Sequence, residues 1–131
     1  PDARYHIEER TDRLKSPEYF DFLRARKIGN VFSHWTWLPD LKRQWQQAGG
    51  FTSNLGVTRL LTPLRATYED TYARYAPFNR LLDELPDMYR DAAFIIRSGM
   101  EINLPTITVV NNRAGGNAPE VTGRIVEQLE L

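Results

Sequence analysis

The sequence has no cysteine among its 131 residues, and this absence removes several kinds of chemistry. Disulfide bridges, thiolate nucleophiles and cysteine-ligated metal centres are all excluded. No apolar run comes near the roughly 20 residues that a membrane-spanning helix requires, and no signal-peptide pattern opens the chain. We therefore expect no membrane partner, and we expect a cytoplasmic location, with which the lack of cysteine is compatible.

The chain also has no excess of charge of either sign. Its 17 lysines and arginines balance its 17 aspartates and glutamates, so the formal net charge is zero. A neutral chain has no long-range field to attract nucleic acid, and no basic stripe is visible, so we expect no nucleic-acid partner. Any anion-binding site in this protein must therefore be local.

Predicted strands and helices alternate along the chain. Short runs rich in apolar and β-branched residues predict four strands, at residues 4–10, 30–35, 56–61 and 105–111. Helices are predicted between these strands and after the last one, at residues 16–27, 39–47, 67–76, 86–98 and 117–131. Gly29 and Gly99 are interpreted as residues that end two of these helices. Such alternation implies a parallel sheet joined by right-handed crossovers.

A parallel sheet of four strands is incomplete by itself. Its two edge strands stay open, and parallel sheets are normally covered on both faces. Twice 131 residues is about 260, close to the roughly 250 that are typical of a (β/α)8 barrel. We therefore predict one α/β domain over residues 1–131 that forms half of a parallel TIM-barrel-like fold. Its partner would be a missing N-terminal half-barrel, or a second copy at the open sheet edges, and the start at Pro1 without methionine indicates a processed or truncated chain.

The helix predicted at 67–76 carries two local patterns. Thr67 and Asp70 have the spacing of a capping box, in which each side chain accepts a hydrogen bond from the other residue's backbone. Tyr68, Tyr72 and Tyr75 follow at spacings of four and three, which places them on one side of the helix. We interpret this stripe as the buried face of the helix and assign it no site.

Five segments carry short motifs, and they occur in this order: Ile7–Arg10, Ser33–Pro39, Val57–Leu61 with Thr67–Glu69, Tyr75–Leu81 and Val109–Pro119. Together they resemble the domain-of-unknown-function-72 (YecE-like) family, in the subgroup with NHWT and VNNRxxGNAP segments. The resemblance implies a TIM-like barrel of which this chain is the C-terminal half. Ser33 and Gly115 depart from the residues usual in that pattern. The family has no established activity, so the resemblance implies a fold and no reaction.

Two candidate acid–base residues lie at predicted strand ends, where (β/α)8 barrels hold their active sites. Glu8 and Arg10 are two residues apart on a strand and share a face with His6, so they form either a structural ion pair or part of a site. His34 ends the second strand and could be a general base or a metal ligand. No second histidine or acid stands at metal-ligand spacing, so we expect a neutral, substrate-facing His34, no metal and no cofactor.

Aromatic and basic residues near the strand ends suggest ligand contacts. Trp35 and Trp37 flank Thr36, and an aromatic floor there could stack a sugar or base. Core packing is the alternative for at least one of the two tryptophans. Arg59 stands inside an apolar strand and needs a partner, either Glu8 or a ligand anion.

The loop after the fourth strand predicts an anion site. Gly115 and Gly116 allow close backbone approach, and Asn117 with Glu120 has the spacing of a capping box for the last helix. Free amides at a helix start attract anions, and TIM barrels often bind phosphate after strands seven and eight. The alternative is a well-capped turn that only closes the barrel. The predicted ligand-binding residues of this loop are Asn111, Asn112, Arg113, Gly116 and Asn117.

Two functions remain open at this point. The first is an enzyme-like barrel that binds a small polar or anionic metabolite, which can carry a phosphate, with Glu8 and His34 as catalytic residues. In this hypothesis Arg10, Arg59 and Arg113 supply positive charge. The second is a non-catalytic binding or scaffold protein whose polar rim is structural. One ligand within reach of both Glu8 and His34 would favour the first, and a filled barrel mouth would favour the second.

Overall fold

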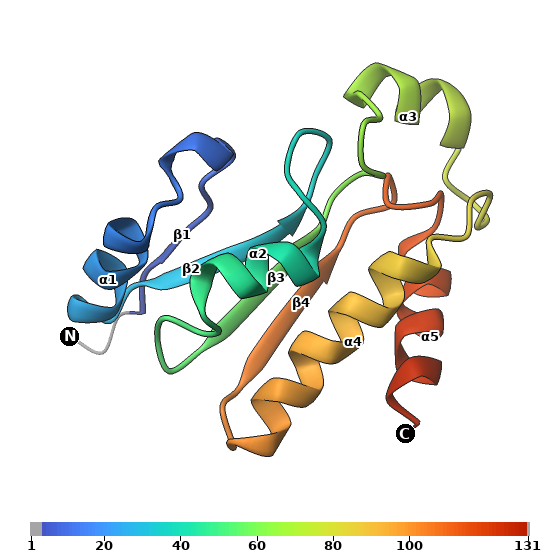
Figure 1. Ribbon diagram of the computed structural model, residues 1–131. Coiled ribbons are helices and arrows are strands. Elements are labelled where there is room, and N and C mark those ends of the chain that lie inside the picture. Colours follow the sequence, from blue (N-terminus) through green and yellow to red (C-terminus); the bar gives the residue numbers. More distant parts are fainter. Residues whose placement is uncertain (1–3, 131) are drawn as a thin grey trace.

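A four-stranded parallel sheet organises the chain. The computed structural model describes residues 4–130, and its strands are β1 (His6–Ile7), β2 (Gly29–His34), β3 (Gly56–Leu60) and β4 (Thr106–Val110). They pair in the order β1-β2-β3-β4, and every pairing in the described part of the chain is parallel (Figure 1). The predicted α/β class and parallel sheet are confirmed, and the bounds of β2, β3 and β4 differ from the prediction by no more than one residue.

The first strand is much shorter than the predicted range 4–10. Only His6 and Ile7 pair with β2. Beyond them Glu9 accepts a hydrogen bond from the backbone N–H of Thr11 at 2.6 Å, and the chain turns into a 3-10 helix at Asp12–Leu14. This local side-chain bond competes with continued pairing to the sheet, so the polar end of the segment leaves β2.

Five α-helices accompany the sheet: α1 (Pro17–Ala25), α2 (Leu41–Ala48), α3 (Tyr68–Tyr75), α4 (Pro86–Glu101) and α5 (Ala118–Leu129). In the described residues none of them combines the length and apolar character needed to cross a membrane. The prediction carried the last helix to residue 131, which lies outside the described residues, whereas α5 ends at Leu129.

The hydrophobic core lies between one face of the sheet and four of the helices. Phe32 of β2 and Leu60 of β3 are fully buried on this face. They belong to one cluster with residues from α1, α2, α4 and α5, which include Leu23, Leu41, Ala92, Ile95 and Val121. Because side chains alternate along a strand, the residues between these core positions face the other side of the sheet.

That other side, called the inner face below, is partly uncovered. Arg59 pairs in register with Ser33 on one side and with Val109 on the other, so these three residues share the inner face. In the described part of the chain Ile107 and Val109 are 50% and 46% exposed. Apolar residues of β4 therefore point into solvent where a closed barrel would bury them.

The helix α3 stands beyond the carboxyl end of β3, apart from the helices that cover the sheet (Figure 1). Its predicted capping box is confirmed, because Thr67 and Asp70 each accept a hydrogen bond from the other's backbone N–H. The predicted buried stripe is wrong, since Tyr75 is 3% exposed but Tyr68 and Tyr72 are 58% and 55% exposed. A helix that does not pack on the sheet has no core to bury a full stripe.

The two predicted glycine helix stops are also wrong. Gly29 is the first residue of β2, and Gly99 lies inside α4. The left-handed backbone position after each helix is taken by another residue, Lys27 with φ of 56° and Asn103 with φ of 54°. Both glycines are instead places of close approach between neighbouring segments.

The two helical glycines offer a matched test of this interpretation. A Cβ atom at Gly99 would lie 2.5 Å from Thr106 Cγ2 and 2.8 Å from the carbonyl oxygen of Leu104, whereas a Cβ atom at Gly123 would meet nothing within 4 Å. We expect Gly99→Ala to lower the free energy of unfolding by about 1–3 kcal/mol, because the clash outweighs the better helix propensity. Gly123→Ala should raise it by about 0.5–1 kcal/mol. Denaturant unfolding measures both, and equal changes would contradict the assignment.

Candidate functional site

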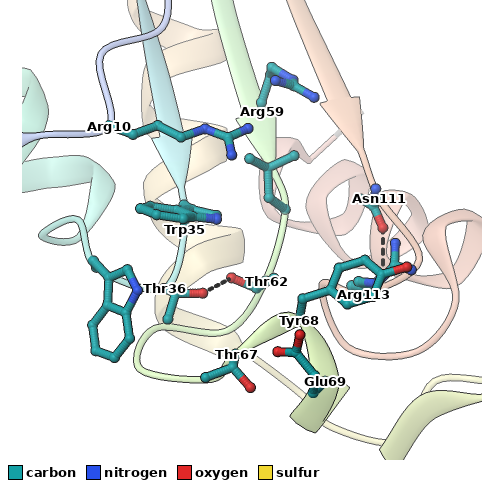
Figure 2. Close-up of a pocket in the computed structure, with 12 residues that line it drawn as sticks. Arg10, Trp35, Thr36, Arg59, Thr62, Thr67, Tyr68, Glu69, Asn111 and Arg113 are labelled. Carbon is teal, nitrogen blue, oxygen red and sulfur yellow. Dashed lines mark hydrogen bonds between the residues drawn. The ribbon is translucent and has the colours of Figure 1, made fainter. Parts of the chain in front are cut away.

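A pocket of about 420 Å³ lies where β2, β3 and β4 end, beside the start of α3 (Figure 2). Five of the residues predicted for a site line it: Arg10, Trp35, Arg59, Asn111 and Arg113. Its other lining residues are Thr36, Trp37, Leu61, Thr62, Thr67, Tyr68 and Glu69. The carboxyl ends of parallel strands thus gather side chains that are far apart in the sequence.

Glu8 holds two of the arginines in place at this pocket. Its Oε2 accepts hydrogen bonds from Arg59 Nη1 at 2.6 Å and from Arg10 Nη2 at 3.2 Å. Its Oε1 accepts a hydrogen bond from Ser33 Oγ. Of the two partners expected for Arg59, the structure therefore shows Glu8. Ser33, which departs from the family pattern, supplies the hydroxyl that orients this carboxylate.

The protonation state of Glu8 follows from these contacts. Burial raises the pKa of Glu8, but the hydrogen bond from Ser33 and the charges of Arg10 and Arg59 outweigh it and lower the pKa below its usual value. The carboxylate is therefore ionised at neutral pH and has no proton to donate. Both of its oxygens are occupied by protein groups, so its visible role is to position two guanidinium groups.

His34 does not join Glu8 in this pocket. Ser33 points toward Glu8, so the next residue on β2, His34, points to the helix-covered face of the sheet. Its Nδ1 is 2.7 Å from the carbonyl oxygen of Thr62, and the residue is 6% exposed. Burial lowers the pKa of His34 against the raising effect of that hydrogen bond, so the ring is neutral at pH 7, as expected. An acid–base pair of Glu8 and His34 around one ligand does not fit this geometry.

Both tryptophans line the pocket, and neither belongs to the buried core of the described residues. The strand β2 ends at His34, and the amide of Leu38 donates to the carbonyl oxygen of Trp35 in the turn that follows. Trp35 and Trp37 stand two residues apart at this turn and reach the same space. The guanidinium carbon of Arg10 lies 5.0 Å from the centre of the Trp35 ring, within the range of a cation–π contact.

The anion site predicted at the start of α5 is wrong, because the amides there already have partners. Asn112 Oδ1 accepts from the backbone N–H of Ala118 at 2.9 Å, and Asn117 Oδ1 accepts from that of Glu120 at 3.1 Å. Pro119 has no N–H to offer. The predicted role of Asn117 as the cap is confirmed, and Asn112 is a second cap rather than a ligand contact.

The glycine pair of this loop faces another segment of the chain and not the pocket. The carbonyl oxygen of Gly115 accepts from the backbone N–H groups of Leu82 and Asp83 at 2.9 and 3.1 Å. A Cβ atom at Gly116, where φ is 124°, would lie 2.5 Å from the carbonyl oxygen of Arg80. The predicted ligand contact at Gly116 is thus replaced by close packing of residues 80–83 on the loop.

The side chain of Glu120 also turns to that segment. Its Oε1 accepts from the backbone N–H of Leu81 at 3.0 Å, so the reciprocal bond of a capping box to Asn117 is not formed. The backbone N–H of Leu81 thus binds the Glu120 carboxylate, which the local pattern assigned to the N–H of Asn117 at the start of α5. This tertiary contact could not be predicted from the spacing of Asn117 and Glu120.

Arg113 is the arginine of the pocket without a carboxylate partner in the described residues. Its backbone N–H is held by Asn111 Oδ1 at 2.9 Å. Arg113 lies beside Tyr68 in the pocket wall (Figure 2), and its guanidinium carbon is 3.9 Å from the centre of the Tyr68 ring. The same carbon lies 5.6 Å from the centre of the Phe78 ring. The Arg113 Nε atom is buried and has no hydrogen-bond partner. This guanidinium group is oriented by aromatic rings and remains available to an anion.

Sequence reasoning missed the contribution of the loop between β3 and α3. Tyr68 was assigned to a buried stripe, yet it lies over Arg113 at the pocket wall. Thr36 and Thr62 bring their hydroxyl oxygens within 3.1 Å of each other in the same wall. The motif at Thr67–Glu69 was the one available signal in the sequence. It contributes to the family resemblance, which implies a fold and does not by itself indicate a site.

The electrostatics of the pocket favour an anion modestly. The guanidinium groups of Arg10, Arg59 and Arg113 line the pocket together with the carboxylate of Glu69. Glu8 already bridges two of the arginines, which leaves Arg113 as the local source of positive charge. Among the described residues no group of three histidine, aspartate or glutamate side chains is arranged to hold a metal ion.

Comparisons with known proteins agree with the family resemblance. No protein-family model and no curated protein matches the sequence. A solved structure of a DUF72 family protein from Enterococcus faecalis V583 is similar to 99% of this chain with a TM-score of 0.70 at 18% identity. A DUF72 family protein from Thermotoga maritima MSB8 is similar to 99% of it with a TM-score of 0.64 at 16% identity.

The chain spans about half of each of these neighbours, 48% and 47% of their lengths. At such low sequence identity the likeness shows a shared fold. The resemblance that the ordered motifs indicated is confirmed by these structural neighbours, since both are DUF72 family proteins.

The Glu8 cluster predicts a pH-dependent contribution to stability. Because its pKa is lowered in the folded state, Glu8 stabilises the fold above its usual pKa of 4.5, and this contribution is lost as the pH falls through the lowered value. We expect Glu8→Gln to reduce the free energy of unfolding by about 1–3 kcal/mol at pH 7, with the difference from the unmodified chain shrinking below pH 4.5. Denaturant unfolding at several pH values checks this. Glu101→Gln, at an exposed position, is the control and should change stability by no more than about 0.5 kcal/mol.

Proposed function

We propose that this chain is the C-terminal half of a DUF72-family (β/α)8 barrel that binds a small polar, anionic ligand at the carboxyl ends of its strands. Three observations support the barrel. The four strands are parallel and in sequential order, the chain spans about half of the solved DUF72 structures, and the inner face of β4 is exposed. Closing such a sheet into a barrel would cover this face and remove both open edges.

The observation that carries the ligand proposal is the guanidinium group of Arg113. It lies in the 420 Å³ pocket without a carboxylate partner among the described residues, and its position is held by Tyr68 and by the bond from its backbone to Asn111. Arg10 and Arg59 add positive charge at the opposite wall, and Trp35 adds an apolar surface. A small molecule with a phosphate or carboxylate and a polar or ring-shaped body suits this combination.

A non-catalytic role is the second candidate, and one observation favours it. The carboxylate of Glu8 is occupied by Ser33, Arg10 and Arg59, and His34 lies on the other face of the sheet. The residues described here thus supply an anchored anion-binding wall and no acid–base pair. We therefore propose ligand binding for this half and assign it no reaction, no cofactor and no nucleic-acid partner.

The ligand proposal predicts charge-specific binding that depends on Arg113. Inorganic phosphate and glucose 6-phosphate should bind weakly and with strong dependence on salt, and glucose alone should not bind. Arg113→Ala should weaken phosphate binding about tenfold or more, because a hydrogen bond to a charged group contributes about 1.5–3 kcal/mol. Calorimetric titration of the complete protein measures this.

The control for that titration is Arg43→Ala, which removes the same charge from the exposed side of α2. It should leave the affinity for phosphate within about twofold of the unmodified protein, since exposed charges beyond about 8–10 Å are screened at physiological salt. Equal losses in the two variants, or no binding by any of the three proteins, would remove the anion site.

The barrel proposal predicts opposite effects of one substitution in two lengths of chain. Val109 lies on the inner face, so Val109→Lys should reduce self-association of the 131-residue chain, measured by light scattering. In a chain extended by the N-terminal half the same change should lower the free energy of unfolding by about 2–4 kcal/mol, because it buries a charge. Val126→Lys, at a 41% exposed site on α5, should do neither. A monomeric 131-residue chain that unfolds cooperatively would contradict the half-barrel.

A further inference from the structure

A second cavity, of about 260 Å³, lies on the helix-covered side of the sheet. It is bounded by the loop that follows β3 and by the start of α4, with His34 of β2 in its wall. Its lining residues are His34, Pro63, Leu64, Glu84, Leu85, Pro86, Asp87 and Met88. None of them lines the 420 Å³ pocket, so the two spaces are separate candidates for binding.

The start of α4, which borders this cavity, has two backbone amides without an acceptor in the described residues. The cap residue Leu85 has no side chain that can accept a hydrogen bond, and Pro86 has no N–H. The first N–H with a helical partner is that of Tyr89, which donates to the carbonyl oxygen of Leu85 at 3.1 Å. Among the described residues the N–H groups of Asp87 and Met88 have no acceptor. In a helix of 16 residues these groups also lie at the positive end of the helix dipole.

His34 supplies an acceptor to the same space. Its Nδ1 lies 2.7 Å from the carbonyl oxygen of Thr62, and a carbonyl oxygen only accepts, so Nδ1 carries the proton. The neutral ring then has a free electron pair on Nε2, which has no partner in the described part of the chain. The residue is 6% exposed and lines the cavity, and the bond from Nδ1 fixes its other ring nitrogen as an acceptor in the cavity wall.

We propose that this cavity binds a small uncharged ligand that carries a primary carboxamide. The amide oxygen accepts from the backbone N–H groups of Asp87 and Met88, and the amide NH2 donates to His34 Nε2. Pro63 and Leu64 provide apolar walls for a short alkyl or ring substituent. This inference does not depend on the anion pocket, because it uses other residues on the other face of the sheet.

The charges around the cavity argue for an uncharged ligand. An anion would meet the electron pair of His34 and the carboxylates of Glu84 and Asp87, which line the same space. Arg124 lies 3.0 Å from Glu84, and Arg90 lies 3.0 Å from Asp87. All four side chains are exposed to solvent, so these ion pairs neutralise the carboxylates only in part. A cation would meet the positive end of α4. A carboxamide offers an acceptor to the N–H groups of Asp87 and Met88 and a donor to His34 Nε2, and it carries no charge.

The test compares two molecules of the same size in the complete protein labelled with nitrogen-15. Isobutyramide should shift the backbone amide signals of Asp87 and Met88 and the ring signals of His34, in a saturable manner at concentrations on the order of millimolar. Isobutyrate should cause no saturable shift of these signals over the same range. Absence of saturation with isobutyramide overturns the proposal, and so does binding of isobutyrate with equal or higher affinity.

Two variants test the role of each wall. His34→Asn keeps a side-chain N–H for the carbonyl oxygen of Thr62 but removes Nε2, and it should weaken isobutyramide about tenfold. Leu64→Trp keeps His34 and narrows the cavity, and it should abolish the shifts even if His34→Asn does not fold. Unchanged isobutyramide affinity in either folded variant overturns the site. Phosphate binding to the 420 Å³ pocket should persist in Leu64→Trp, which separates failure of this proposal from failure of the anion site.

Discussion

The carboxylate of Glu8 connects the ends of three strands, and the arrangement of the larger pocket depends on it. β1 pairs with β2 through His6 and Ile7 alone, so the hydrogen bond to Ser33 and the ion pair with Arg59 extend the connection past the end of that short strand. A carboxylate with little exposure is stable there because each oxygen has a charged or hydroxyl partner. The same contacts set the positions of Arg10 and Arg59 at the pocket wall.

Alternation along β2 divides the chemistry of the protein between two faces. Ser33 points toward Glu8 and the inner face, while His34 points toward α4 and the helix-covered face. Ser33 thus bonds the carboxylate that positions Arg10 and Arg59 at one cavity, while His34 lines the other, and the two cavities share no lining residue. Because successive residues of a strand point to opposite faces, Ser33 meets Glu8 on the inner face while His34 lies on the other face. The two candidate acid–base residues, Glu8 and His34, are therefore kept apart.

The loop after β4 shows how a tertiary contact replaces a local pattern. Gly115 and Gly116 have φ values of 123° and 124°, which other residues rarely adopt, and they let residues 80–83 approach the loop closely. Glu120 turns to Leu81, and Asn112 and Asn117 cap the start of α5. The anion-binding character of this end of the sheet then rests with Arg113, whose guanidinium group is held by Tyr68 instead of by a carboxylate.

The sequence by itself determined the α/β class, the parallel order of the strands and the caps at Thr67 and Asn117, since periodicity and capping are local properties. It also identified five residues that line the larger pocket, because polar residues at the ends of parallel strands meet at one edge of the sheet. Only the tertiary structure decided which face His34 occupies and that Tyr68 is exposed beside Arg113. It also decided that the first amides of α5 have acceptors, whereas those of Asp87 and Met88 in α4 have none among the described residues. These outcomes depend on where each strand ends and on contacts between segments tens of residues apart, which spacing along the chain does not encode.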